Sequence, residues 1–97
     1  MVFDLSKITT PHGYQEIKEK SRSLFQVEGK TFLVKNKNTI EVRCDNELSK
    51  HLQEKYESVM QSRYFGRGGI EIVLTKQLSE QEINDLIRLS YDMTDKS

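Results

Sequence analysis

Hydrophobic positions along this chain recur with two periods, and each period predicts a different kind of element. Residues 39–45 (TIEVRCD) alternate strictly between apolar and polar positions, which predicts a half-buried antiparallel strand. Two similar runs, 23–28 and 30–35, are separated by a single glycine, which predicts a hairpin. Two more strands are predicted at 59–65 and 70–75, joined by a glycine-rich loop over 66–69.

Three other segments carry helical signals. Thr10-Pro11 offers an N-cap followed by a first-turn proline, which predicts a helix from Pro11 to about Arg22. Asp45 or Asn46 can cap a second helix, in which an apolar residue recurs at every fourth position. The third helix opens with Ser79-Glu80-Gln81-Glu82, a capping box in which the first and last residues satisfy each other's backbone amides.

The predicted element order is α-β-β-β-α-β-β-α. Short connections between neighbouring strands require antiparallel pairing, so we expect an α+β fold with a sheet of about five strands and helices packed on one face. A length of 97 residues suits a single domain over residues 1–97 with one core, and residues 1–10 read as a loose lead-in. The other face of the sheet should meet water or a partner.

Charge is balanced overall but unevenly distributed. Fifteen Lys and Arg match fifteen Asp and Glu, so the strongly basic composition of many nucleic-acid binders is absent. Residues 18–67 nevertheless hold eleven basic and seven acidic side chains, whereas residues 77–97 hold two basic and five acidic. Cys44 is the only cysteine and reads as a small buried hydrophobe. Without an apolar run long enough to cross a bilayer or a signal-peptide pattern, we expect a cytoplasmic location and no membrane contact.

Three stretches resemble the MmcQ/YjbR family: Glu41 to Val59 (EVRCDNELSKHLQEKYESV), Tyr64 to Leu74 (YFGRGGIEIVL) and Leu78 to Thr94 (LSEQEINDLIRLSYDMT). The likeness covers about residues 23–95, and the N-terminal part is shorter than the family leads one to expect. The resemblance implies an α+β sandwich similar to the frataxin-like CyaY fold. It also implies DNA binding through two hairpin wings, although fold alone does not establish function. Many members carry a His-Trp pair where this chain has Gly68-Gly69, so no role of that pair is transferred.

No catalytic pattern emerges from the sequence. His12 and His51 lack the spacing to another His, Cys or carboxylate that a metal or nucleophile site requires. Frataxin-like proteins bind iron through acidic clusters, but the acids that bunch at 80–85 are explained by the helix dipole. We therefore expect no enzyme activity, no metal, no cofactor and no small-molecule substrate.

Two basic hairpin tips are the strongest candidates for a functional contact. Arginines flank two aromatic residues on the glycine-rich tip of the second hairpin, where they could grip phosphate and stack on bases. The 35–43 hairpin adds three cations that are expected on the open face of the sheet. The nucleic-acid-binding candidates are Lys35, Lys37, Arg43, Arg63, Tyr64 and Arg67.

Two functions remain open at this level. The first is a DNA-binding module that neutralises about four or five phosphates, with weak, salt-sensitive, micromolar or poorer affinity. The second is a protein-interaction or regulatory domain that binds a partner, or a second copy of itself, through the open sheet face or an exposed strand edge. Solvated surface charge and a tight hairpin packed on the core explain the same residues without any ligand.

Overall fold

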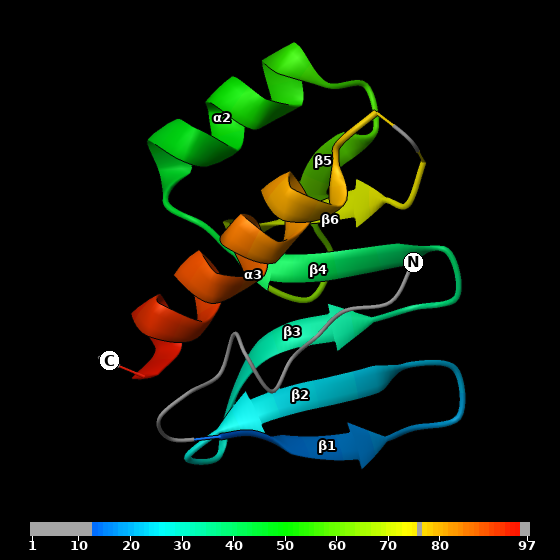
Figure 1. Cartoon of the computed structure of the whole chain (residues 1–97), viewed down its shortest axis with the longest axis vertical. Helices are drawn as coiled ribbons and strands as arrows, with labels where there is room; N and C mark the ends of the chain where they lie inside the picture. Colours follow the sequence, from blue (N-terminus) through cyan, green and yellow to red (C-terminus); the bar gives the residue numbers. More distant parts are fainter. Residues whose placement is uncertain (1–12, 76, 96–97) are drawn as a thin grey trace.

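The computed structural model describes residues 13–75 and 77–95, which form an antiparallel sheet and two helices (Figure 1). In chain order the elements are β1 (Gln15–Lys18), β2 (Ser23–Val27), β3 (Lys30–Lys35), β4 (Thr39–Arg43), α2 (Asn46–Lys55), β5 (Val59–Ser62), β6 (Gly66–Val73) and α3 (Glu80–Asp95). The sheet has six strands in the order β1-β2-β3-β4-β6-β5. The predicted α+β class is confirmed, with six strands in place of about five.

The predicted N-terminal helix is wrong over the part of it that the structure describes. Its proposed start at Thr10-Pro11 lies outside the described residues, and residues 15–18 form β1, which pairs antiparallel with β2. Glu19 N donates to Arg22 O (2.8 Å) and closes the turn between them. All four residues of β1 are exposed, so this edge strand carries no apolar alternation that would reveal it in the sequence.

The predicted glycine loop at 66–69 is also wrong. The turn occupies residues 63–65, and β6 begins at Gly66. Gly69 pairs with Arg43 of β4, and Cys44 N donates to Gly68 O (2.9 Å). An added Cβ at Gly69 would lie 2.5 Å from Val42 O and 2.7 Å from Phe65 Cβ. The glycine therefore permits close packing inside the sheet and does not form the turn.

Local signals elsewhere are confirmed. Glu28 and Gly29 connect β2 to β3 with φ angles of 51° and 80°, the positive values that a tight two-residue hairpin requires. The Asp45 side chain caps α2 by accepting from Leu48 N (2.9 Å). At the start of α3, Ser79 N donates to Glu82 Oε1 and Glu82 N donates to Ser79 Oγ, both at 3.1 Å.

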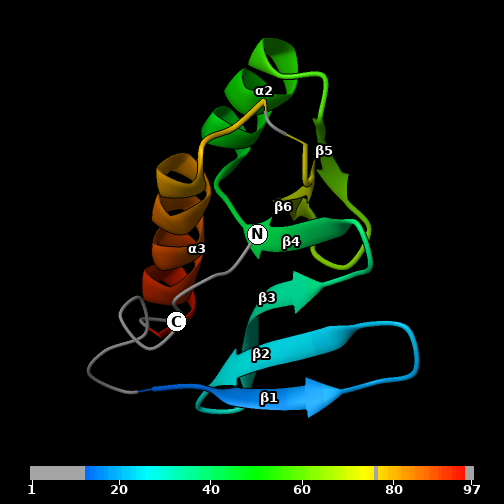
Figure 2. The ribbon, with the colours of Figure 1, turned by 45° about the vertical axis from the view of Figure 1, so that its right-hand side comes forward.

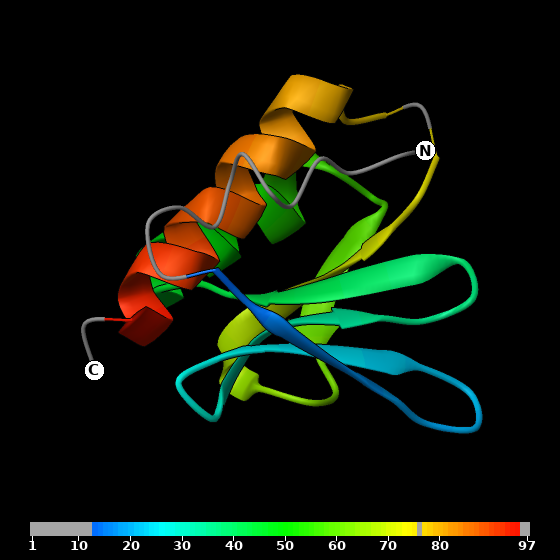
Figure 3. The same ribbon diagram turned by 60° about the horizontal axis from the view of Figure 1, so that its bottom comes forward.

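Both helices cover the same face of the sheet, and the core lies between them and the strands (Figures 2 and 3). Ile40 and Val42 of β4 are fully buried, as are Ile83 and Ile87 of α3. Cys44 continues the β4 alternation into the core, and its burial, with the nearby Asp45 carboxylate, raises the pKa of the thiol to about 11. A thiol in that state is not a nucleophile at neutral pH.

A serine hydroxyl joins α3 to two strands at once. Arg43 N donates to Ser90 Oγ (2.7 Å), and Ser90 Oγ donates to Phe32 O (2.6 Å). The register between β2 and β3 shifts at this level and leaves Phe32 as an extra residue in β3. The neighbouring Tyr91 ring packs edge-on against the Phe32 ring, with centroids 5.0 Å apart. The Ser90-Tyr91 pair thus fixes α3 against the bulge.

Gly69→Ala should destabilise the fold by about 1–3 kcal/mol, because the new methyl group would overlap Val42 O and the Phe65 side chain. Urea denaturation measures this change. Gly68→Ala is the matched control, since a Cβ there meets only Phe65 O at 3.5 Å. Equal stabilities of the two variants would contradict the packing role of Gly69.

Candidate functional site

The helix-free face of the sheet, here called the open face, carries two buried acids. Antiparallel register places one residue from each strand in a row across it: Ile17, Leu24, Val34, Glu41, Glu71 and Met60. Glu41 and Glu71 face each other directly, and each is only 2% exposed. Two adjacent carboxylates in a dry position repel each other, so each needs donors of its own.

Glu41 obtains three hydrogen bonds. Its Oε1 accepts from Ser62 Oγ (2.8 Å) and from Tyr64 N (2.9 Å), and its Oε2 accepts from Asn36 Nδ2 (2.9 Å). Burial alone would raise the pKa of this carboxyl, but the donors together outweigh burial and hold the pKa below its ordinary value of 4.5. Glu41 is therefore a charged anchor at neutral pH.

Glu71 forms an ion pair with Arg63. Arg63 donates from Nε to Oε1 (2.9 Å) and from Nη2 to Oε2 (2.8 Å), and Thr39 Oγ1 donates to Oε2 (2.8 Å). This two-bond pairing raises the pKa of Arg63. The Arg63 guanidinium is thus held in an ion pair with Glu71, although 76% of the Arg63 side chain remains exposed.

The residues after Arg63 fold back onto the open face. Tyr64 Oη lies 3.2 Å from Thr31 Oγ1, and the Tyr64 ring packs edge-on against the Phe65 ring at 4.9 Å. The Arg43 guanidinium lies 5.0 Å from the Phe65 ring centroid and donates from Nε to Thr31 O (2.9 Å). Three predicted site residues, Arg43, Arg63 and Tyr64, therefore hold the β5–β6 turn against the sheet.

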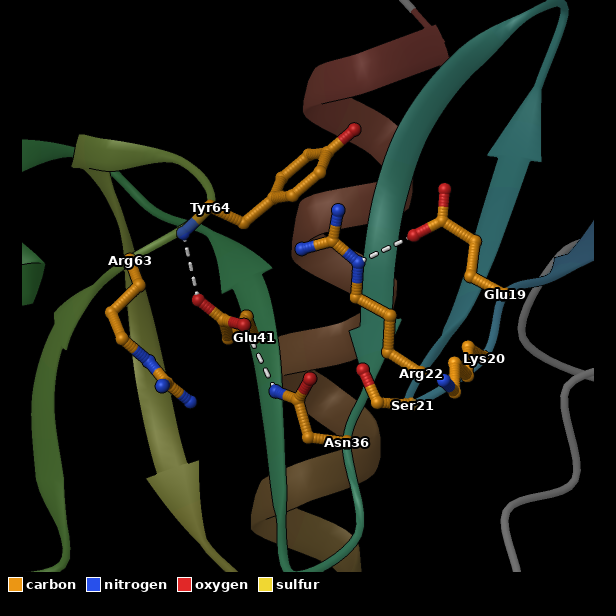
Figure 4. A pocket seen from close by; sticks show the side chains of 8 residues that line it. All are labelled: Glu19, Lys20, Ser21, Arg22, Asn36, Glu41, Arg63 and Tyr64. Carbon is orange, nitrogen blue, oxygen red and sulfur yellow. Dashed lines mark hydrogen bonds and ion pairs between the residues drawn. The ribbon is translucent and has the colours of Figure 1, made fainter.

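A hollow of about 710 Å³ lies between this turn and the β1–β2 turn, and we call it the open-face hollow (Figure 4). It is lined by Glu19, Lys20, Ser21, Arg22, Asn36, Glu41, Arg63 and Tyr64. Arg22 crosses it: Nε donates to Glu19 Oε1 (2.6 Å), and the guanidinium lies 5.2 Å from the Tyr64 ring centroid. The hydrogen bond to Glu19 is the main cause of the raised pKa of Arg22.

A second hollow, of about 260 Å³, adjoins the first at the same end of the sheet, and we call it the turn-end hollow. The two share Glu19, Ser21, Arg22 and Asn36. Lys18, Lys35 and Lys37 contribute to its wall. Within residues 13–75 and 77–95, the side chains of these three lysines and of Lys20 make no hydrogen bond, ion pair or ring contact.

The structure brings only some of the predicted site residues together. Lys35 and Lys37 meet at the β3–β4 turn. Arg43 lies at the far end of β4, and the expectation that it flanks that turn beside Lys35 is wrong. The expectation that Lys35 projects from the open face is also wrong, because Lys35 pairs with Ile40 on the helix-facing side. Arg43 pairs with Gly69 on the open face. Arg67 lies on β6 and lines a separate hollow beside α2.

Three basic residues of the site, Lys18, Lys20 and Arg22, were not among the candidates from the sequence. Their segment was assigned to a helix, which separates them from the β3–β4 turn. The available signal was the polar run KEKSR at 18–22, which precedes an alternating strand and is typical of a hairpin turn.

The acids at the start of α3 serve the helix. The Ser79 backbone N–H, followed by the Tyr56 hydroxyl (2.8 Å) and the Ser79 hydroxyl, lowers the pKa of Glu82. Among the described residues, no group of three or more His, Cys, Asp or Glu side chains could hold a metal ion. No helix in the same part of the chain is long and apolar enough to cross a membrane.

Fold and site together define an α+β domain whose open face is closed by a turn anchored on two glutamates. Residues 6–93 match the family model of YjbR, and the chain belongs to the YjbR family. The match confirms the resemblance and extends it toward the N-terminus. No curated protein and no solved structure gives a significant match.

Glu41→Gln should destabilise the protein at pH 7, and the deficit should shrink as the pH falls. Folding lowers the pKa of the Glu41 carboxyl below its ordinary value of 4.5. The carboxylate therefore stabilises the native state at pH values above 4.5, and that contribution is lost as the pH falls through the native pKa. Urea denaturation of wild type and variant between pH 7 and pH 3 measures the difference. Glu47→Gln, an exposed change on α2, is the control. A deficit that is constant with pH would refute the anchor role.

Proposed function

We propose that this chain binds DNA weakly through four lysines on two adjacent turns. The observation that carries the proposal is the grouping of Lys18, Lys20, Lys35 and Lys37 around the joined hollows, each without a partner among the described residues. The arginines nearby are held by protein groups, so the lysines are the cations available to an incoming polyanion. Lysine contacts to phosphate supply affinity without reading sequence.

The spacing of the turns suits a nucleic-acid backbone. Both turns lie at one end of the sheet, because Lys18 pairs with Ser23 and Ser23 pairs with Lys35. The β1–β2 and β3–β4 turns are separated by two strand spacings, roughly 10 Å. That distance corresponds to about three nucleotides of one strand at ~3.4 Å each. Because Arg22 and Phe65 already contact the Tyr64 ring, the proposal does not include base stacking.

Neutralising about four phosphates implies a salt dependence of log K against log salt of roughly −3 to −4, and micromolar or poorer affinity. The balanced net charge of the chain gives no additional long-range attraction. The proposed role is therefore a weak contact that a second copy or another domain would strengthen.

Lys35→Gln/Lys37→Gln should weaken DNA binding and reduce the magnitude of the salt slope by about 2, since each lysine accounts for about one phosphate. Fluorescence anisotropy with short duplex and single-stranded DNA at about 50 and 200 mM salt measures both quantities. Lys50→Gln/Arg67→Gln removes the same charge from the helix-covered side and should leave the slope unchanged.

Equal losses in the two double variants would mean that only net charge matters, which contradicts the proposed surface. Absence of binding at low salt with up to roughly 100 µM protein would end the proposal, since four contacts should be detectable there. Arg63→Ala is unsuitable as a probe, because it leaves the Glu71 carboxylate buried without its cation.

A second candidate is a protein contact at β1, possible because this edge strand pairs with β2 alone among the described residues. Tyr14 and Ile17 are 40% and 42% exposed there, and an added strand could pair with such an edge. The open sheet face is the less suitable surface, because the β5–β6 turn covers its centre.

If β1 pairs with β1 of a second copy, Ile17→Lys should abolish self-association, because a charge on an edge strand opposes pairing. Light scattering after size exclusion, over about 10–500 µM protein, covers the range of weak association. A monomeric wild type throughout, or a dimer that Ile17→Lys leaves intact, would eliminate this homodimer.

A further inference from the structure

A third hollow lies beside α2, away from the two turns that carry the lysines. It has a volume of about 320 Å³ and is lined by Asn46, Ser49, Lys50, Gln53, Gln61 and Arg67. We call it the α2 hollow, since four of these residues belong to α2 and the other two to the β5–β6 hairpin. Gln61 pairs with Ile70, whose row also contains the buried Val42, so the hollow opens on the helix-covered side. It shares no residue with the two other hollows.

Its charge is all of one sign. Lys50 and Arg67 are the charged lining residues, and no carboxylate lines the hollow. Neither cation makes a hydrogen bond, ion pair or ring contact in the part of the chain that the structure describes. Elsewhere the guanidinium groups of Arg22, Arg43 and Arg63 are bound by protein groups. Two cations facing one hollow repel each other, and a bound anion would relieve that repulsion.

The remaining lining groups are neutral hydrogen-bonding side chains. Gln53 Nε2 donates to Ser49 Oγ (2.9 Å), which orients its amide within the hollow. Asn46 and Gln61 add two more amides, and an amide nitrogen can donate to an oxyanion. An arginine fork, a lysine and several amide donors around one cavity are the groups that bind a phosphate. The volume lies at the small end of ligand pockets, which run from about 300 to 1,000 Å³.

We infer that the α2 hollow binds a phosphate dianion, either free or as the monoester of a small molecule, between Lys50 and Arg67. This site is independent of the proposed DNA contact, because it shares no lining residue with the two hollows beside the lysine turns. Arg67, a candidate for a wing-tip contact in the sequence, acts here with a helix residue.

The test is an NMR titration of the full chain with sodium phosphate at about pH 7.5, with sodium chloride holding the ionic strength constant. Saturable shifts are expected at the backbone amides of Lys50 and Arg67 and at the side-chain amides of Gln53 and Gln61. Arg67→Gln should weaken phosphate binding about tenfold, the usual effect of losing one charged hydrogen-bonding group. Lys37→Gln removes the same single charge elsewhere and is the matched control, and it should leave phosphate affinity at the α2 hollow as in wild type.

Glycerol 3-phosphate in a parallel titration separates the two sources of the dianion. Tighter binding than inorganic phosphate indicates a monoester, and equal or weaker binding indicates free phosphate; either result supports the site. Shifts that stay linear up to roughly 50 mM, where two cations should already bind, would overturn the inference. So would unchanged affinity in Arg67→Gln, or saturable shifts confined to the lysine turns. Spectral dispersion shows in the same experiment that each variant is folded.

Discussion

Two facing carboxylates on the open face determine how the rest of that face is built. Glu41 and Glu71 occupy paired positions on β4 and β6, and burying both without donors would be prohibitively costly. The chain meets this requirement with donors from the β3–β4 turn, the start of β4 and the β5–β6 turn. The acids therefore draw the β5–β6 turn over the sheet and hold it there. In the described part of the chain, no buried side-chain polar atom is left without a partner.

This constraint also divides the basic residues by role. Arg43 and Arg63 support the turn, and Arg22 joins the β1–β2 turn to Tyr64. The planar fork of arginine suits these fixed, multi-bonded contacts, whereas lysine keeps a flexible and hydrated charge. Within residues 13–75 and 77–95, the side chains of the lysines on the two turns have no partner. At this end of the sheet the arginines therefore organise the turns, and the lysines are the cations left without a partner among the described residues.

Local sequence signals predicted the elements whose formation depends on local contacts. The capping box at Ser79, the cap at Asp45 and the alternation of β4 all correspond to observed structure. β1 was assigned to a helix because an edge strand exposed on both sides has no apolar period, and only its pairing with β2 makes it a strand. The glycine-rich segment 66–69 resembles a loop in the sequence. In the structure a glycine is needed at position 69 because the Phe65 side chain packs directly against it.

The sequence by itself therefore determined the fold class, the family, the starts of the two observed helices and the strands with one apolar face, because each follows from neighbouring residues or a repeating period. It also identified two of the four lysines at the proposed contact, Lys35 and Lys37. Only the tertiary structure decided which of the basic side chains are bound by other described residues. Arg63 is paired with Glu71, and the Arg43 guanidinium lies over the Phe65 ring. The lysines lie together because the turns that carry them are adjacent. The partners lie in other elements than the cations, Glu71 in β6 and Phe65 in the β5–β6 turn. Their approach is set by sheet register, which the residues around each cation do not encode.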